Sequence, residues 1–383
     1  MYDFDAIIPR RGTGSYKWDT PASDDTLPMW VADMDFRTAP AIIEAMQQRL
    51  EHGIFGYTKV PDAYYEAAIN WFRRRHGWEF RREWMIYTTG VVPAFSAIIQ
   101  ALTQPGDKVI IQTPAYNCFF SSIRNSGCEL LANPLRYENG LYSFDFEDLE
   151  AKAADPAAKV LLLCNPHNPS ARVWSRDELA EVARICEKHG IFVIADEIHC
   201  EFATEGFRYT PYASLSESAL LHSATCISPS KAFNIAGLHM ANIVCAHDST
   251  RRRIDKAINV NEVCDINVFA VPALIAAYNH GESWLDALKT YLSGNDALVR
   301  AVFRERLPRY SIPPLEGTYL EWIDCRPSGK SGDEVAELLL AEGLMVNSGS
   351  MYGDGAFIRL NIACPRSQVA RALEILCRVL SLG

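Results

Sequence analysis

Two polar motifs that follow apolar runs contain residues able to perform acid, base or nucleophilic chemistry. Lys231, in Ser228-Pro229-Ser230-Lys231, could lose its charge on desolvation and react through a free amine. Asp196 ends another apolar run, and a partly buried carboxylate needs a partner such as a protonated pyridine nitrogen. Taken singly, each residue has an ordinary alternative. Most lysines are solvated surface charges, and Asp196 could simply pair with Arg or Lys.

Three further motifs suit an aromatic ligand that carries a phosphate. A glycine turn at Gly90 precedes an expected helix, and the free backbone N–H groups of a turn at a helix start suit an anion. Tyr116 could stack on an aromatic ring. Asn168 lies in a rigid loop with two Asn-Pro pairs and could donate to a ring oxygen. The alternatives are a plain strand-to-helix turn, an interface tyrosine and a structural loop.

The elements that carry these motifs alternate between short apolar runs and helical stretches. The pattern predicts strands at 85–88, 108–112, 159–164, 191–195, 224–227 and 241–246, and helices at 93–103, 175–189 and 249–258. This rhythm is typical of a mostly parallel sheet covered on both faces. Ligands of such sheets bind beyond the carboxyl ends of the strands. Because all five motifs follow predicted strands, we expect them to form one site.

The C-terminal part of the chain has a different pattern, which begins near Gly281. It predicts strands at 318–324 and 357–362 and helices at 332–342 and 367–380, which together form a compact α+β unit. We therefore predict a large domain at 45–280 and a smaller one at 281–383. The irregular segment 1–44 is expected to join the smaller domain and cover the site, because its apolar side chains would not remain in water.

Composition restricts the partners of the chain. The 383 residues carry a net charge of −10, which argues against nucleic acid or an anionic membrane surface as the main partner. No apolar run approaches the length of a membrane span, and the start lacks an apolar signal core. The 11 cysteines include no C-x-x-C pair, so we expect no disulfide framework and no metal site. A reducing cytoplasm fits this usage.

The chain resembles the fold-type I enzymes that depend on pyridoxal 5′-phosphate (PLP), the aspartate aminotransferase superfamily, from about residue 27 onward. More narrowly, it is similar to the MalY/PatB group of cystathionine β-lyases, or C–S lyases. The stretches that carry the resemblance are 28–36, 55–58, 89–93, 164–169, 196–200, 228–238, 347–353 and 357–365. The resemblance implies an α/β fold with a mostly parallel seven-stranded sheet and a smaller α+β domain.

The resemblance also implies a role for each site residue. Lys231 would bind the cofactor covalently and act as the catalytic base, and Asp196 would pair with the pyridinium nitrogen. Asn168 would bond the ring hydroxyl. The other cofactor contacts implied are Tyr116 on the ring, Ser228, Ser230 and the backbone of Gly90, Val91 and Val92 at the phosphate, and His199.

The substrate contacts implied centre on Arg359, whose guanidinium would hold the α-carboxylate in a bidentate fork. Ala32, Asn168 and Tyr116 complete this set. Tyr57 is implied to be catalytic and to reach the phosphate of a neighbouring subunit, which predicts a homodimer with shared active sites.

Three residues depart from related sequences. Many aminotransferases have Tyr at the position of His199 and a phosphate-binding Arg at that of His239. Glu201 stands where the group often has Asp.

The function implied is β-elimination of cysteine S-conjugates such as L-cystathionine, which would yield a thiol (homocysteine), pyruvate and ammonia. An amino acid aminotransferase shares the early steps and is the alternative enzyme. A regulatory role through binding another protein is the alternative of a different class.

Overall fold

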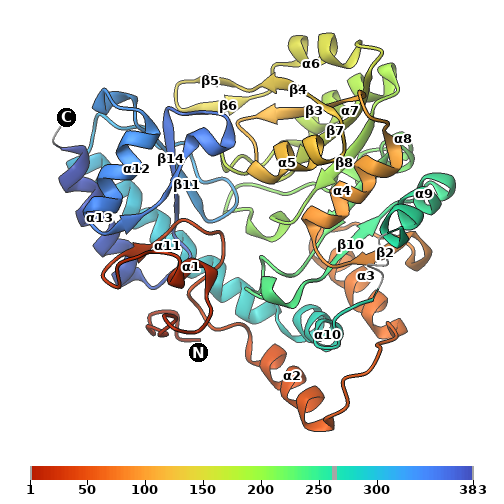
Figure 1. Ribbon diagram of the computed structural model, residues 1–383, viewed down its shortest axis with the longest axis horizontal. Helices are drawn as coiled ribbons and strands as arrows, with labels where there is room; N and C mark the ends of the chain where they lie inside the picture. The colour runs from red at the N-terminus through yellow and green to blue at the C-terminus, as the bar shows by residue number, and fades with distance from the viewer. Residues whose placement is uncertain (1, 261–264, 382–383) are drawn as a thin grey trace.

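The computed structural model describes residues 2–260 and 265–381, which fold around a sheet of seven strands (Figure 1). The strands are β2 (Met85–Thr88), β3 (Lys108–Thr113), β4 (Glu129–Pro134), β7 (Ala158–Cys164), β8 (Phe192–Asp196), β9 (Ser223–Ile227) and β10 (Ala241–Val244). Their order is β2-β10-β9-β8-β7-β3-β4. Only the pairs made by β10 are antiparallel. The predicted α/β class with a mostly parallel sheet is confirmed.

Helices cover both faces of this sheet because its central strands are apolar on both sides. In β7, Val160 and Leu162 join one buried core, whereas Leu161 and Leu163 join the other. The helices of the first core are α4 (Val91–Leu102), α5 (Asn117–Asn125) and α9 (Asp248–Asn259). Those of the second core are α6 (Phe146–Ala153), α7 (Arg176–His189) and α8 (Glu217–Leu221). The hairpin β5 (Arg136–Glu138) and β6 (Leu141–Ser143) adjoins β4.

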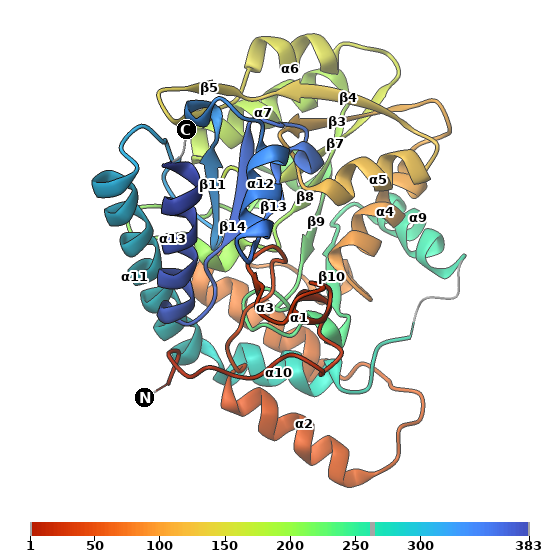
Figure 2. The same ribbon diagram turned by 60° about the vertical axis from the view of Figure 1, so that its left-hand side comes forward.

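The C-terminal unit contains a second sheet of three strands, in the order β11-β14-β13. Its strands are β11 (Leu320–Asp324), β13 (Asn347–Ser348) and β14 (Phe357–Asn361), and its helices are α11 (Glu282–Arg306), α12 (Gly332–Ala341) and α13 (Arg366–Leu380). The N-terminal segment lies beside this unit in both views (Figures 1 and 2). There β1 (Leu27–Pro28) pairs in parallel with β12 (Leu344–Met345). The exact domain limits, 45–280 against 1–44 and 281–383, stay a prediction.

Three further helices pack together. They are α2 (Pro40–His52), α3 (Asp62–His76) and α10 (Ala270–His280), and α10 packs against both of the others. A short helix, α1 (Tyr16–Asp19), interrupts the irregular N-terminal segment. Within the described ranges, no helix is long and apolar enough to cross a membrane.

Candidate active site

One cavity of about 540 Å³ lies at the carboxyl ends of the parallel strands and receives side chains from all five motifs. Its walls also include residues of the N-terminal segment and of the C-terminal unit, so the site lies where these parts meet. Of the predicted site residues, those that line it are Ala32, Gly90, Val91, Val92, Tyr116, Asn168, Asp196, His199, Ser230, Lys231 and Arg359. Ser228 and Tyr57 do not.

Lys231 follows β9 and is held by the N-terminal segment. Its Nζ donates to the Ala32 carbonyl oxygen at 2.6 Å, and the Tyr319 hydroxyl donates to the same oxygen at 3.0 Å. Desolvation and the nearby Arg359 charge lower the Lys231 pKa to about 8. A substantial share of this amine is therefore neutral near pH 8 and able to accept a proton or act as a nucleophile.

Asp196 ends β8 and presents a carboxyl group to the cavity at 3% exposure. Its Oδ1 accepts the backbone N–H of Ile198 at 3.2 Å, and no residue of the described ranges forms an ion pair with it. Burial raises the Asp196 pKa to about 7. A cation placed at this carboxylate would restore its ordinary ionisation, so the site suits a protonated nitrogen.

Arg359 projects from β14 and is almost fully buried. Its Nη1 donates to Asn168 Oδ1 at 3.1 Å and its Nη2 to the Trp30 carbonyl oxygen at 2.9 Å. Its guanidinium carbon lies 4.7 Å from the centre of the Tyr352 ring, and its Nε has no partner among the described residues. Because Asn168 uses its oxygen for Arg359, its amide hydrogens are left for a ligand. The guanidinium has an unused donor for a carboxylate.

The N-terminus of α4 forms part of the cavity wall. This helix begins at Val91, two residues earlier than predicted, and no side chain of the described residues caps its first turn. The free N–H groups at Val91 and Val92 therefore suit an anion. Ser228 donates its hydroxyl to the Met240 carbonyl oxygen at 2.7 Å, so its assignment to the phosphate stays a prediction. His239 also lines the cavity.

The aromatic residues of the site have different environments. Tyr116 lies in the cavity wall at the start of α5, and burial raises the pKa of its hydroxyl. Burial also lowers the His199 pKa to about 3, so this imidazole is neutral. His199 Nδ1 is buried and has no partner within the described ranges, which leaves it for a ligand. Tyr57 lies between α2 and α3 with 99% of its surface exposed, outside the cavity of its own chain.

Glu201, for which the sequence offered no explanation, anchors the loop behind the site to α3. Its carboxylate is 2.7 Å from both Trp71 Nε1 and His76 Nε2, and 3.0 Å from Arg75 Nε. Burial opposes its ionisation, but the charges of His76 and Arg75 hold its pKa at about 2. The carboxylate of Glu201 thus contacts three polar side chains of α3.

Several residues of the cavity wall were not predicted from the sequence. Trp30, Asn347 and Tyr352 lie in stretches that carry the family resemblance, but no role was assigned to them. Tyr16 and Met351 also line the cavity. Tyr16 belongs to a helix of four residues, which is too short to give a periodic signal.

Known proteins share both the sequence and the architecture of this chain. The family of class I and II aminotransferases matches residues 25–376. Cystathionine beta-lyase PatB of Bacillus subtilis is 40% identical over 99% of this chain and 100% of its own. Protein MalY of Escherichia coli is 34% identical over 97% of each chain. The solved structure of cystalysin from Treponema denticola, which contains PLP, has a TM-score of 0.97 and 33% identity, and covers 100% of this chain and 99% of its own.

Proposed function

Because the chain belongs to the class I and II aminotransferase family, we propose that its cavity performs the chemistry of the carbon–sulfur lyases within that family. The enzyme cleaves the Cβ–S bond of L-cysteine S-conjugates such as L-cystathionine. One water is consumed, and homocysteine, pyruvate and ammonia are released. The similarity to cystathionine β-lyases over nearly the whole chain favours this reaction over transamination.

The cofactor is pyridoxal 5′-phosphate, and the cavity fits it. Asp196 is a buried carboxyl that forms no ion pair within the described ranges, which suits the pyridinium nitrogen. The uncapped N-terminus of α4 suits the phosphate. Asn168 and His199 have polar atoms left for the ring substituents, and Tyr116 forms a wall against which the ring would stack. The phosphate would also lie near Ser230, which lines the same cavity.

Individual residues of the cavity have separate roles in the proposed reaction. When bound, PLP withdraws electrons from the substrate Cα and so makes its proton removable. Lys231 Nζ, whose lowered pKa leaves it partly neutral, accepts that proton. Arg359 holds the α-carboxylate through the donor that it does not use internally. The observation that carries the proposal is that Lys231, Asp196 and Arg359 line one cavity although they lie on three different strands or strand ends.

The proposal is tested by supplying L-cystathionine to the purified PLP-loaded enzyme without any keto acid. We expect free thiol and pyruvate to appear in equal amounts. Sustained turnover that requires a keto acid acceptor and releases no thiol would identify a transaminase instead.

The active unit proposed is a homodimer. Tyr57, at 99% exposure, is free to reach a second subunit, where it would contact the phosphate. Exposed apolar side chains lie in the same stretch of chain, namely Leu50, Ile54 and Phe55. A cluster of this kind is typical of a protein contact surface. The ten cysteines in the described ranges are free thiols, which supports the proposed location in a reducing cytoplasm.

A further inference from the structure

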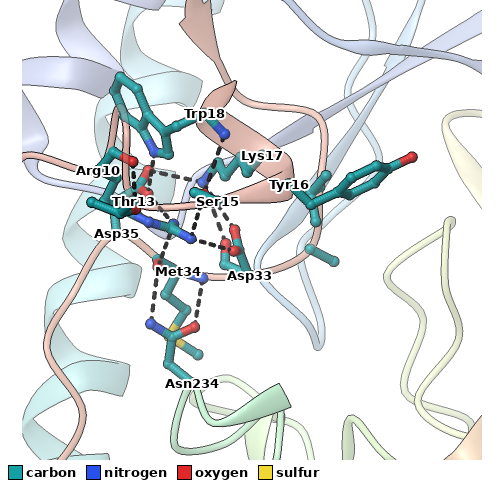
Figure 3. Close-up of polar contacts among 12 residues, drawn as sticks. Arg10, Thr13, Ser15, Tyr16, Lys17, Trp18, Asp33, Met34, Asp35 and Asn234 are labelled. Carbon is teal, nitrogen blue, oxygen red and sulfur yellow. Dashed lines mark hydrogen bonds and ion pairs between the residues drawn. The ribbon is translucent and has the colours of Figure 1, made fainter. Parts of the chain in front are cut away.

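A polar network fixes the N-terminal segment beside the cavity; we call it the clasp and define it as Arg10, Lys17, Trp18, Asp33 and Asp35 (Figure 3). Asp35 lies 2.8 Å from Lys17 Nζ, 2.6 Å from Arg10 Nη1 and 2.7 Å from Trp18 Nε1. Arg10 also reaches Asp33 at 2.7 Å. Because Lys17 and Asp35 are both almost fully buried, the clasp gives α1 one defined position.

A second anchor ties the clasp to the catalytic lysine. Asn234, three residues after Lys231, accepts the Met34 N–H at 2.9 Å and donates to the Met34 carbonyl at 2.9 Å. The same amide donates to the Phe36 carbonyl at 2.9 Å. These bonds hold the N-terminal segment against the loop that follows Lys231.

The clasp presents an aromatic pair, Tyr16 and Trp30, to the cavity. Their ring centres are 5.2 Å apart, and Trp30 Nε1 donates to the Lys17 carbonyl at 3.1 Å, which fixes the indole. Figure 3 shows Tyr16 pointing away from the polar network. Tyr16 is 72% exposed although it lines the cavity, as does Met351 at 43%. Exposed apolar surface at a cavity wall suits contact with a ligand.

Each charged side chain of the cavity already has a role in the proposed reaction, so none is left for the S-substituent. Among the described residues that line it, the charged side chains are Asp196, Lys231 and Arg359. In the proposed lyase these serve the cofactor, the proton and the α-carboxylate. A charged S-substituent would therefore meet no further charged partner among the described residues of its own subunit, and withdrawing it from water there would be unfavourable. An aromatic S-substituent could instead pack on Tyr16 and Trp30.

We propose that this enzyme prefers L-cysteine conjugates with an uncharged aromatic S-substituent over L-cystathionine, and that Tyr16 is a specificity-determining residue. The proposal rests on the lyase function proposed above. The distal end of L-cystathionine carries an ammonium and a carboxylate, whereas that of S-benzyl-L-cysteine is an uncharged ring. The aromatic pair thus favours the second substrate.

The test measures kcat/KM for pyruvate release from S-benzyl-L-cysteine and L-cystathionine with the PLP-loaded enzyme. We expect the wild type to favour the benzyl substrate, and Tyr16→Ala to lower its kcat/KM about three- to tenfold. The value for L-cystathionine should stay within about twofold. Tyr16→Phe should behave as wild type. Phe207→Ala removes another exposed aromatic ring, outside the cavity, and should change neither value.

The outcomes separate this proposal from the one on which it rests. A wild type that releases pyruvate from neither substrate would contradict the lyase function. A wild type that cleaves both but prefers L-cystathionine overturns the specificity proposal and leaves the lyase function standing. Equal losses for both substrates in Tyr16→Ala, or no loss for either, also overturn it. Unchanged visible absorption of the bound cofactor shows that the variant retains its site.

Discussion

At the scale of single residues, Asp196 and Lys231 are buried in a way that makes them reactive and also destabilises the fold. Burial moves the pKa of each toward neutrality, to about 7 and about 8 respectively. Both shifts mean that the charged form is disfavoured in the protein without cofactor. Such residues are retained for function and lower the stability of the fold.

We predict that Asp196→Asn stabilises the cofactor-free protein in a pH-dependent way. The folded-state pKa of Asp196 lies above its ordinary value, so the folded protein binds more protons than the unfolded one between about pH 4 and 7. Wild-type stability therefore falls as pH rises through this window, and the Asn side chain does not titrate. The amount by which the melting temperature of the variant exceeds that of the wild type should be larger at pH 8 than at pH 5. The change corresponds to about 1–3 kcal/mol in the free energy of unfolding. An offset that does not change with pH would contradict this assignment.

Most of the chemical residues could be predicted from the sequence because each follows an apolar strand. Lys231, Asp196 and Asn168 could be recognised in this way, and the structure places all three in one cavity. Tyr16 could not, because nothing local distinguishes it from an ordinary surface tyrosine. Its position depends on the contacts that the next residue, Lys17, makes with Asp33 and Asp35. These carboxylates lie well beyond one helical turn along the chain and cannot be paired with Lys17 from spacing alone.

At the scale of elements, strands with a strong apolar pattern were predicted and those without one were not. β4 was missed because it is an edge strand with mixed exposure and carries Pro134 at its end. The helix predicted at 93–103 begins at Val91, because a proline in the first turn needs no N–H partner and does not mark the start. The strand predicted at 318–324 begins only at Leu320, since Thr318 has a positive φ of 68°.

The clasp is the element that we predict to be most sensitive to loss of one charge. Asp35→Asn removes the nearer carboxylate of the buried Lys17 ammonium, at 2.8 Å, and leaves it only the more distant Asp33 at 3.5 Å. The free energy of unfolding should therefore fall by about 3 kcal/mol. Asp24→Asn is the matched control in the same segment. Its side chain is 96% exposed and 3.6 Å from Arg11, so the change should be below about 0.5 kcal/mol. Thermal melting of both variants gives the comparison, and equal melting temperatures would contradict the role of the clasp.

At the scale of the whole molecule, the site is assembled from parts far apart in the sequence. Ala32, Lys231 and Arg359 come from the N-terminal segment, the large sheet and the C-terminal unit. The sheet could be predicted from apolar periodicity. The way the ends of the chain close over it could not, because it depends on long-range bonds such as that from Arg359 to the Trp30 carbonyl.

The proposed dimer gives a prediction at this scale. Sedimentation of the PLP-loaded enzyme should show a dimer as the active species. Tyr57→Phe removes a hydroxyl that is exposed in the single chain, so it should leave melting unchanged but increase loss of PLP on dialysis. A monomer with full activity, or a Tyr57→Phe variant that retains PLP as wild type does, would refute the shared site.

The role of Lys231 is tested most directly by the rate of pyruvate release from L-cystathionine by Lys231→Ala, beside Lys188→Ala as a control. Lys188 is a surface lysine paired with Glu150, so its removal should leave the rate within about twofold of wild type. Loss of the amine that accepts the Cα proton should lower the rate by at least about 10²–10⁴-fold. If Lys231→Ala instead released pyruvate at the wild-type rate, the catalytic amine would lie elsewhere and the assignment of this cavity would be wrong.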